Sequence, residues 1–168
     1  LVATVEPGLS MGELANALAR KGLRFLPADA PYYRHLSVGE WVYRGCPNVS
    51  SWKYGPGKHT LMGSSYILPS GKCIRTGGKT VKNVTGYDFT RFLAGAYCDI
   101  GIGVEFLLKL LPQPEYRLRF SASFASLPHV FGFIDFLREN PIAPAFLMAA
   151  DAKTQRLLLD VTDAAPFL

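Results

Sequence analysis

The most strand-like segment of the chain runs from Val104 to Leu111 and reads VEFLLKLL. Every second residue from Val104 to Leu110 is apolar, and Leu107 and Leu111 make the opposite face apolar too. Strands that are covered on both faces have this composition, because neither side meets water. We therefore predict that residues 104–111 form a central strand.

A β-hairpin is predicted shortly before this strand. Residues 61–68 are strand-like, Pro69–Lys72 have the composition of a turn, and residues 73–76 lead back. Gly77 and Gly78 end the returning strand.

The N-terminal part predicts a capped helix followed by loops. Ser10 and Glu13 have the spacing of a capping box, which predicts a helix from there to about Lys21 with Gly22 as its left-handed stop. Residues 27–57 show no clean periodicity, so we expect loops suited to ligand contacts there. The helix residues expected to face inward are Leu14, Ala17 and Leu18.

A second pattern starts after residues 112–115, which have the composition of a linker. Alternation over residues 116–120 predicts a half-buried strand, and apolar residues from Val130 to Leu137 have helical spacing. Residues 145–150 and 156–161 predict a hairpin. This β-α-β-β order is typical of the beginning of an α+β module.

Composition excludes several classes of protein. The 168 residues are 49% apolar and 18% charged, which is not the composition of a disordered chain. The sequence has no run long enough to predict a membrane-spanning helix and no signal peptide. The three cysteines and three histidines are widely scattered, so neither a metal site nor a disulfide framework is predicted and a reducing, cytoplasmic setting is expected. Those residues are Cys46, Cys73, Cys98, His35, His59 and His129.

The positive charge of the chain is concentrated in one segment. Residues 51–92 contain seven Lys or Arg against one Asp, whereas the rest contains eleven against twelve Asp or Glu. Such a block attracts an anion, which could be nucleic acid, a cofactor pyrophosphate or a carboxylate substrate.

Two nucleotide-binding patterns are incomplete. Gly78-Lys79-Thr80 resembles the end of a P-loop, but Cys73 stands where that pattern requires glycine. Gly101-Ile102-Gly103 resembles a dinucleotide fingerprint, but its third glycine position is Phe106, inside the predicted strand. What is left is a basic, glycine-broken loop over residues 76–88, which is suited to cradle a diphosphate.

The segment from Gly77 to Pro112 resembles the FAD-linked oxidases of the vanillyl-alcohol oxidase type, which carry a PCMH-type FAD-binding domain. The likeness rests on Lys82-Asn83-Val84-Thr85-Gly86-Tyr87-Asp88, Ala94-Gly95-Ala96-Tyr97, Gly101-Ile102 and Lys109-Leu110-Leu111-Pro112. Val5-Glu6-Pro7-Gly8 also matches. Within the family, the chain is most similar to the smaller FAD-binding subunit of bacterial glycolate oxidase, and next to the larger subunit of that oxidase and the D-lactate dehydrogenases.

The resemblance implies an α+β fold in two parts. Residues 1–115 would form the second lobe of the FAD-binding domain, a mostly antiparallel sheet with flanking helices. Residues 116–168 would begin the α+β cap over the substrate. The family's first lobe, whose glycine-rich loop grips the FAD pyrophosphate, is expected before Leu1.

The resemblance also implies which residues contact FAD. Backbone contacts are expected from two segments, and Lys82 and Asn83 are weaker candidates. Glu40 stands where the family has a second glycine, and Cys98-Asp99 replaces a smaller pair, so each departure could repel the cofactor or point away from it. No catalytic residue is carried over, because the family supplies these groups largely from the cap. The expected backbone contacts are Ser37, Val38, Gly39, Gly95, Gly101 and Ile102.

The function implied is that of an FAD-dependent oxidoreductase subunit that oxidises a 2-hydroxy acid such as glycolate or D-lactate. Its expected partners are a larger FAD subunit and an iron–sulfur subunit, which could hold this cytoplasmic chain at the inner membrane face. Two alternatives stay open. The lobe could have lost flavin and serve only in docking, or the basic block could bind nucleic acid, although basic and aromatic residues do not alternate there as a stacking platform requires.

Overall fold

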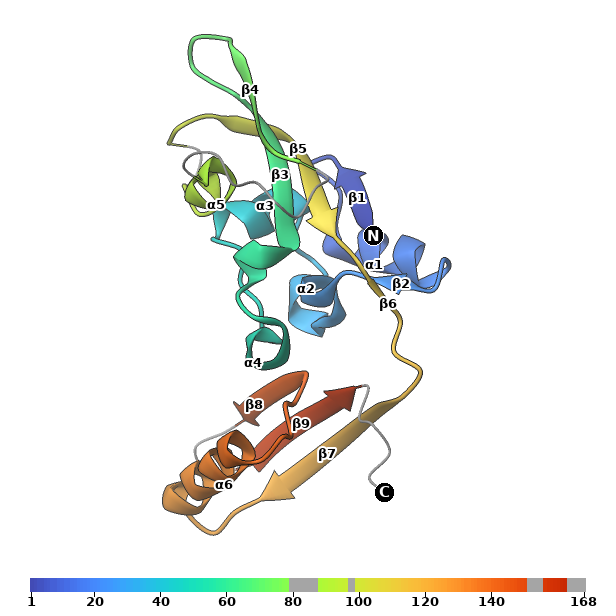
Figure 1. The fold of residues 1–168 in the computed structure, drawn as a ribbon, viewed down its shortest axis with the longest axis vertical. Helices are drawn as coiled ribbons and strands as arrows, with labels where there is room; N and C mark the ends of the chain where they lie inside the picture. The colour runs from blue at the N-terminus through green and yellow to red at the C-terminus, as the bar shows by residue number, and fades with distance from the viewer. Residues whose placement is uncertain (79–87, 97–98, 151–155, 163–168) are drawn as a thin grey trace. The chain divides into compact units, whose positions relative to one another are not determined.

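The computed structural model describes residues 1–78, 88–96, 99–150 and 156–162. The chain divides into two compact units (Figure 1). The first comprises Leu1–Asn48 and Pro56–Gln113, and the second comprises Val49–Gly55 and Pro114–Leu168. Residues 49–55 therefore group with the second unit, although we expected them in a first domain of residues 1–115. The identities of the two units as flavin lobe and cap stay predictions.

A four-stranded antiparallel sheet forms the centre of the first unit, with strand order β1-β5-β3-β4 (Figure 1). The predicted central strand is confirmed as β5, which pairs with both β1 and β3. It ends at Lys109, and the expectation that both faces are covered is wrong, because Glu105 and Lys109 on the second face are exposed. The predicted hairpin is confirmed too, as β3 and β4. A two-stranded ladder joins β2 to β6. The strand bounds are β1 Val2–Val5, β2 Leu23–Arg24, β3 Leu61–Ile67, β4 Cys73–Gly77, β5 Ile102–Lys109 and β6 Leu111–Pro112.

Short helices accompany this sheet. The expectation of loops over residues 27–57 is wrong in part, because that segment contains several helices. Helices of four to six residues span too few turns to show a period in the sequence, which explains the error. The bounds are α1 Met11–Ala19, α2 Leu26–Asp29, α3 Val38–Tyr43 and α5 Phe89–Leu93, with 3₁₀ turns at Pro31–Tyr33 and Gly57–Thr60.

Helix α1 begins with the predicted capping box. The Ser10 hydroxyl accepts a hydrogen bond from the Glu13 amide at 3.1 Å, and the Glu13 carboxylate accepts from the Ser10 amide at 3.2 Å. Gly22 follows the helix with φ of 67°, as predicted. The prediction that Ala17 faces inward is wrong, because Ala17 is exposed and Met11 is buried instead. Met11 lies one turn before Leu14 on the same face, so the buried stripe starts at the first helical residue.

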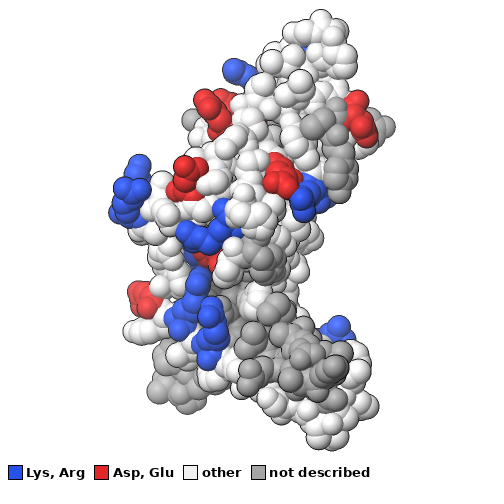
Figure 2. All heavy atoms as spheres, turned by 180° about the vertical axis from the view of Figure 1, so that it is seen from behind, with Lys and Arg blue, Asp and Glu red and all other residues white. Residues whose placement is uncertain are grey.

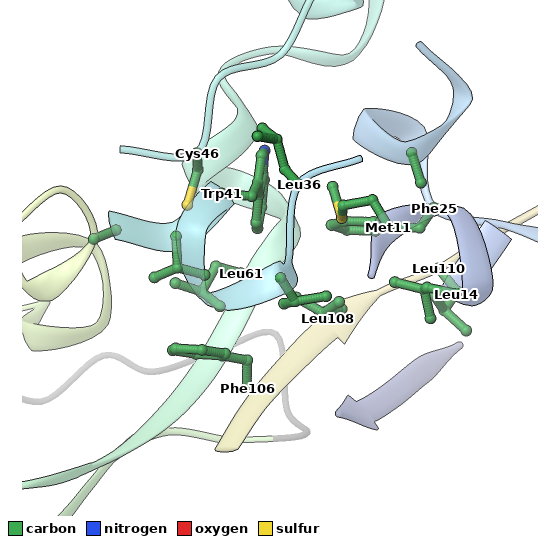
Figure 3. Packing of buried hydrophobic residues seen from close by; sticks show 14 of the residues in the cluster. Met11, Leu14, Phe25, Leu36, Trp41, Cys46, Leu61, Phe106, Leu108 and Leu110 are labelled. Atoms are coloured by element: carbon green, nitrogen blue, oxygen red, sulfur yellow. The ribbon is translucent and has the colours of Figure 1, made fainter. Parts of the chain in front are cut away.

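The hydrophobic core of the first unit joins α1 and α3 to the sheet (Figure 3). Trp41 of α3 is fully buried, and its ring meets Phe25 edge to face at 5.2 Å between centroids. Phe106 and Leu108 of β5 are fully buried in the same cluster. Burying a large aromatic side chain contributes about 1.5–3 kcal/mol, so these residues dominate the stability of the unit.

The second unit contains a three-stranded antiparallel sheet with strand order β7-β9-β8. Its predicted β-α-β-β order is confirmed. Among the described residues, the model has no helix that is long and apolar enough to cross a membrane. The bounds in this unit are α4 Ser51–Tyr54, β7 Arg117–Ser123, α6 Leu127–Glu139, β8 Phe146–Ala150 and β9 Arg156–Thr162.

Strand β7 differs from its prediction. We expected a half-buried strand, but Leu118 and Phe120 are 54% and 52% exposed. The small core of this unit consists of Val130 and Leu137 of α6 with surrounding residues that include Leu147. Helix α6 thus packs against Leu147 of β8, whereas Leu118 and Phe120 of β7 are not part of this core.

The capping box of α1 makes a pH-dependent prediction. Hydrogen bonds from the Ser10 hydroxyl and then the Ser10 amide lower the pKa of the Glu13 carboxyl from its ordinary value. A lowered pKa stabilises the fold above the carboxyl's unfolded pKa of about 4.3, and this stabilisation is lost as pH falls through the folded pKa. We expect Glu13→Gln to lower the melting temperature at pH 7 and to have little effect near pH 3, measured by circular dichroism. Glu105→Gln, an exposed carboxylate on β5, is the control and should show no such difference; an effect of Glu13→Gln that persists at low pH would contradict the prediction.

Candidate functional site

Helix α3 brings together the two segments that were predicted to contact FAD through their backbone. It contains Val38 and Gly39 from the first segment. The Gly95 amide donates to the carbonyl of Val42 at 3.0 Å. The Gly103 amide, next to Ile102, donates to the hydroxyl of Tyr43 at 2.8 Å. Segments that lie more than fifty residues apart in the sequence thus meet at α3.

The local sequence explains why α3 forms and ends where it does. Ser37 caps the helix, since its hydroxyl accepts from the Glu40 amide at 3.0 Å. Gly45 follows with φ of 81° and Cys46 with φ of 57°, and this left-handed backbone stops the helix. The Trp41 ring nitrogen then donates to the carbonyl of Pro47 at 2.9 Å, which fixes the chain that leaves α3.

The backbone amides at the start of α3 already have acceptors within the chain. The Val38 amide donates to the carbonyl of Leu9, and the Gly39 amide donates to the carbonyl of Pro7, both at 2.8 Å. Together with the bond from Glu40 to Ser37, the first three amides of the helix are satisfied. These are the donors that a bound anion at a helix start would need.

The predicted contact glycines lie where the chain approaches itself closely. A Cβ atom added to Gly39 would lie 2.9 Å from the Pro7 side chain, and one added to Gly101 would lie 2.6 Å from the Ile67 carbonyl oxygen. Gly95 has φ of 92°, a conformation that favours glycine. Close packing at Gly39 and Gly101 and the backbone conformation at Gly95 therefore account for glycine at all three positions.

The predicted site residues differ in their access to solvent. Val38, Gly39 and Gly101 are buried, whereas Ile102 is 64% exposed at the start of β5. Ile102 pairs across the sheet with Ile67, which is 41% exposed. Of the predicted contacts, Ile102 is the side chain that a ligand could reach most easily. Lys82, Asn83 and Cys98 lie outside the described residues.

The two ends of the predicted basic loop are held by hydrogen bonds. At one end, Gly78 donates through its amide to the carbonyl of Met62 at 3.1 Å. At the other end, Asp88 caps α5 by accepting from the Arg91 amide at 3.1 Å. The Thr90 hydroxyl, which is buried, donates to the Thr76 hydroxyl at 3.0 Å and so ties α5 to β4.

One ion pair and one buried thiol lie on or next to α3. Glu40 and Arg44 form an ion pair one turn apart, and both side chains are exposed. Burial raises the pKa of the Cys46 thiol to about 12, with a smaller opposing effect of Lys58, so this thiol is neutral at pH 7 and is not a nucleophile. Among the described residues there is no cluster of His, Cys, Asp and Glu that could hold a metal ion. On the face drawn in Figure 2, Lys and Arg side chains form separate groups among acidic and uncharged residues.

Two residues at the site were not predicted from the sequence. Tyr43 received no role, although its hydroxyl holds the start of β5. Pro7 was part of the family likeness, but its packing against Gly39 was not foreseen. A tyrosine at the end of a short apolar run carries no signal for a partner sixty residues away, so only the three-dimensional structure reveals this bond.

Comparison with known proteins finds relatives of this chain. It is 32% identical, over an alignment of 169 residues, to an uncharacterized FAD-linked oxidoreductase of Mycobacterium tuberculosis. The match covers 96% of this chain and 36% of that protein. It is 31% identical to the glycolate oxidase subunit GlcD of Bacillus subtilis, over 95% of this chain and 34% of that protein. These relatives confirm the predicted resemblance to FAD-linked oxidases. The chain spans about a third of the length of these curated relatives.

Further relatives match over shorter parts of the chain. The glycolate oxidase subunit GlcE of Escherichia coli is 32% identical over 70% of this chain and 34% of its own length. Enzymes named D-lactate dehydrogenase and D-2-hydroxyglutarate dehydrogenase also match. No family model matches the sequence.

Structural comparison finds a solved structure with a similar fold. A solved structure of alkyldihydroxyacetonephosphate synthase superposes with a TM-score of 0.78 at 14% identity, over 96% of this chain and 34% of that one. At this identity the likeness concerns the fold alone. The predicted fold class, an α+β arrangement built on antiparallel sheets, is confirmed.

The packing of Gly101 makes a testable prediction. Gly101→Ala places a methyl group against the Ile67 carbonyl in a buried position, so we expect a loss of about 1–3 kcal/mol in the free energy of unfolding. Urea denaturation measures the loss. Gly8→Ala is the matched control, because no atom lies within 4 Å of a Cβ added at that exposed glycine. Equal stability of the two variants would contradict the packing role of Gly101.

The bond between Tyr43 and Gly103 makes a second prediction. Tyr43→Phe leaves the buried Gly103 amide without this acceptor, which should cost about 1–3 kcal/mol of unfolding free energy. The same denaturation measurement applies. Tyr116→Phe, at a tyrosine that is 69% exposed, should leave stability unchanged. If Tyr43→Phe behaves like this control, the bond contributes nothing to stability.

Proposed function

We propose that this chain is part of an FAD-dependent oxidoreductase that oxidises a small 2-hydroxy acid such as glycolate or D-lactate. In this proposal the first unit is the second lobe of the flavin domain, and the second unit is the beginning of the substrate-covering cap. FAD supplies the redox chemistry when it is bound, and the protein supplies shape and orientation.

One observation supports this proposal more strongly than the others do. The match to the glycolate oxidase subunit GlcD extends over 95% of this chain and so includes both units. Glycolate, D-lactate and D-2-hydroxyglutarate, which appear in the names of related enzymes, are all 2-hydroxy acids. The shared chemical class of these substrates supports a 2-hydroxy acid for this protein too.

The proposal includes partner subunits. Both GlcD and GlcE are named as subunits of glycolate oxidase, which supports an assembly of several chains. We propose a larger FAD-carrying subunit and an iron–sulfur subunit as partners, in the cytoplasm or at the inner face of the membrane.

The start of α3, which we expected only to line the flavin with its backbone, offers no amide donors for the diphosphate of that cofactor. A diphosphate needs free amide donors, and the amides of Val38, Gly39 and Glu40 all donate within the chain. Glu40 adds a carboxylate to the same turn. If the flavin touches the described residues of this lobe, the exposed edge at Ile102 offers more access than the start of α3.

A second candidate function follows from this observation. The lobe could serve as a flavin-free docking subunit for a catalytic oxidase subunit. The satisfied amides of α3 favour it.

Flavin titration separates the two candidates. The full-length protein that contains this chain is mixed with FAD, and bound flavin is measured by absorbance after gel filtration. The oxidoreductase proposal expects FAD at about one equivalent, followed by anaerobic bleaching of the flavin on addition of glycolate or D-lactate. A colourless protein that co-purifies with a larger oxidase subunit would instead support docking and contradict the FAD proposal.

A further inference from the structure

The sequence contains the same five-residue pattern twice. Leu9–Glu13 reads LSMGE and Leu36–Glu40 reads LSVGE. Each copy starts a helix, with serine as the N-cap of α1 or α3 and glutamate at the third helical position. The two serines, Ser10 and Ser37, face each other in an isolated antiparallel bridge.

In the first copy, the amides at the helix start donate to the second copy and its approach. The Met11 amide donates to the carbonyl of Leu36 at 2.9 Å, and the Gly12 amide donates to the carbonyl of Arg34 at 3.0 Å. These are the first two amides of α1, which have no acceptor within their own helix.

In the second copy, the arrangement is the same with the roles exchanged. The Val38 amide donates to the carbonyl of Leu9 and the Gly39 amide to the carbonyl of Pro7. The first two amides of α3 are thus satisfied by the segment that leads into α1. Each copy caps the other.

The third amide of each helix is satisfied by the serine of its own copy. The Glu13 amide donates to the Ser10 hydroxyl at 3.1 Å, and the Glu40 amide donates to the Ser37 hydroxyl at 3.0 Å. In both helices, therefore, the first three amides are satisfied in the same order and by equivalent groups.

The same close approach explains why each copy contains a glycine. A Cβ atom at Gly12 would lie 3.1 Å from the Arg34 carbonyl oxygen, and one at Gly39 would lie 3.1 Å from the Pro7 carbonyl oxygen. A side chain at either position would push the two copies apart. Gly12 lies outside every segment expected to contact flavin, so this geometry needs no cofactor to explain it.

We propose that Leu9–Glu13 and Leu36–Glu40 form a reciprocal capping joint, and that Ser37–Glu40 is half of this joint and not a diphosphate-binding segment. An anion could reach the amides of α3 only by displacing the carbonyls of Pro7 and Leu9. It would also have to approach the carboxylate of Glu40 in the first turn of α3, and α3 has only six residues. The joint follows from the hydrogen bonds alone, whereas its meaning for FAD rests on the proposed function.

A double-mutant cycle tests the joint. Gly12→Ala and Gly39→Ala should each lower the melting temperature by roughly 4–8 °C, and the double variant should lose clearly less than the sum, because opening the joint once already removes the shared contact. Gly8→Ala should have no effect. Additive losses would overturn the joint, since independent helix starts behave additively.

A matched pair of variants, each at an exposed carboxylate, tests whether the FAD diphosphate binds next to Ser37–Glu40. Glu13→Gln and Glu40→Gln of the full-length protein are each titrated with FAD by flavin fluorescence. The joint predicts that both variants bind FAD within about twofold of the parent protein. A carboxylate next to the diphosphate would repel it, so FAD binding at least about fivefold tighter in Glu40→Gln alone would overturn the inference.

The two experiments also distinguish failure of the joint from failure of the proposed function. If the parent protein binds no FAD, the proposed function loses its cofactor, and the cycle of melting temperatures decides the joint by itself. If FAD binds and only Glu40→Gln changes its affinity, the proposed function stands and Ser37–Glu40 belongs to the flavin site.

Discussion

Helix α3 has only six residues, and a helix of that length is not stable by itself in water. It persists because its first amides donate to Pro7 and Leu9 and because Trp41 is fully buried against the core. The rest of the first unit depends on this arrangement. The Gly95 turn and the start of β5 are both fixed by hydrogen bonds to the last turn of α3.

This dependence changes the interpretation of the glycines in the family-like segments. Glycine in a flavin-domain motif suggests a close approach between backbone and cofactor. At Gly39 and Gly101 the close approach is between two parts of the same chain. The need for glycine is the same in both cases, since any Cβ atom would collide, so the residue type alone cannot distinguish a ligand from a neighbouring strand or turn.

The resemblance to FAD-linked oxidoreductases and the fold agree with each other in this chain. The first unit has an antiparallel sheet with α1 and α3 in its core, and the second has the β-α-β-β order of an α+β module. The second unit has a small core around Val130 and Leu137, and the apolar residues Leu118 and Phe120 of β7 stay exposed.

The central strand, the hairpin before it, the capping box of α1 and the family resemblance could all be predicted from the amino-acid sequence, because each depends on residues that are close together in the chain. Periodicity failed for α3, whose six residues are too few to show it, and for β7, because alternation does not reveal whether a partner covers the apolar face. The candidate site was predicted only as separate segments. The pairing of Pro7–Gly12 with Arg34–Gly39 decides which of their backbone amides have an acceptor within the chain. The same pairing explains why residue 39 is a glycine. Hydrogen bonds between segments twenty-seven residues apart form only when the chain folds back on itself, and the tertiary structure alone supplies that information.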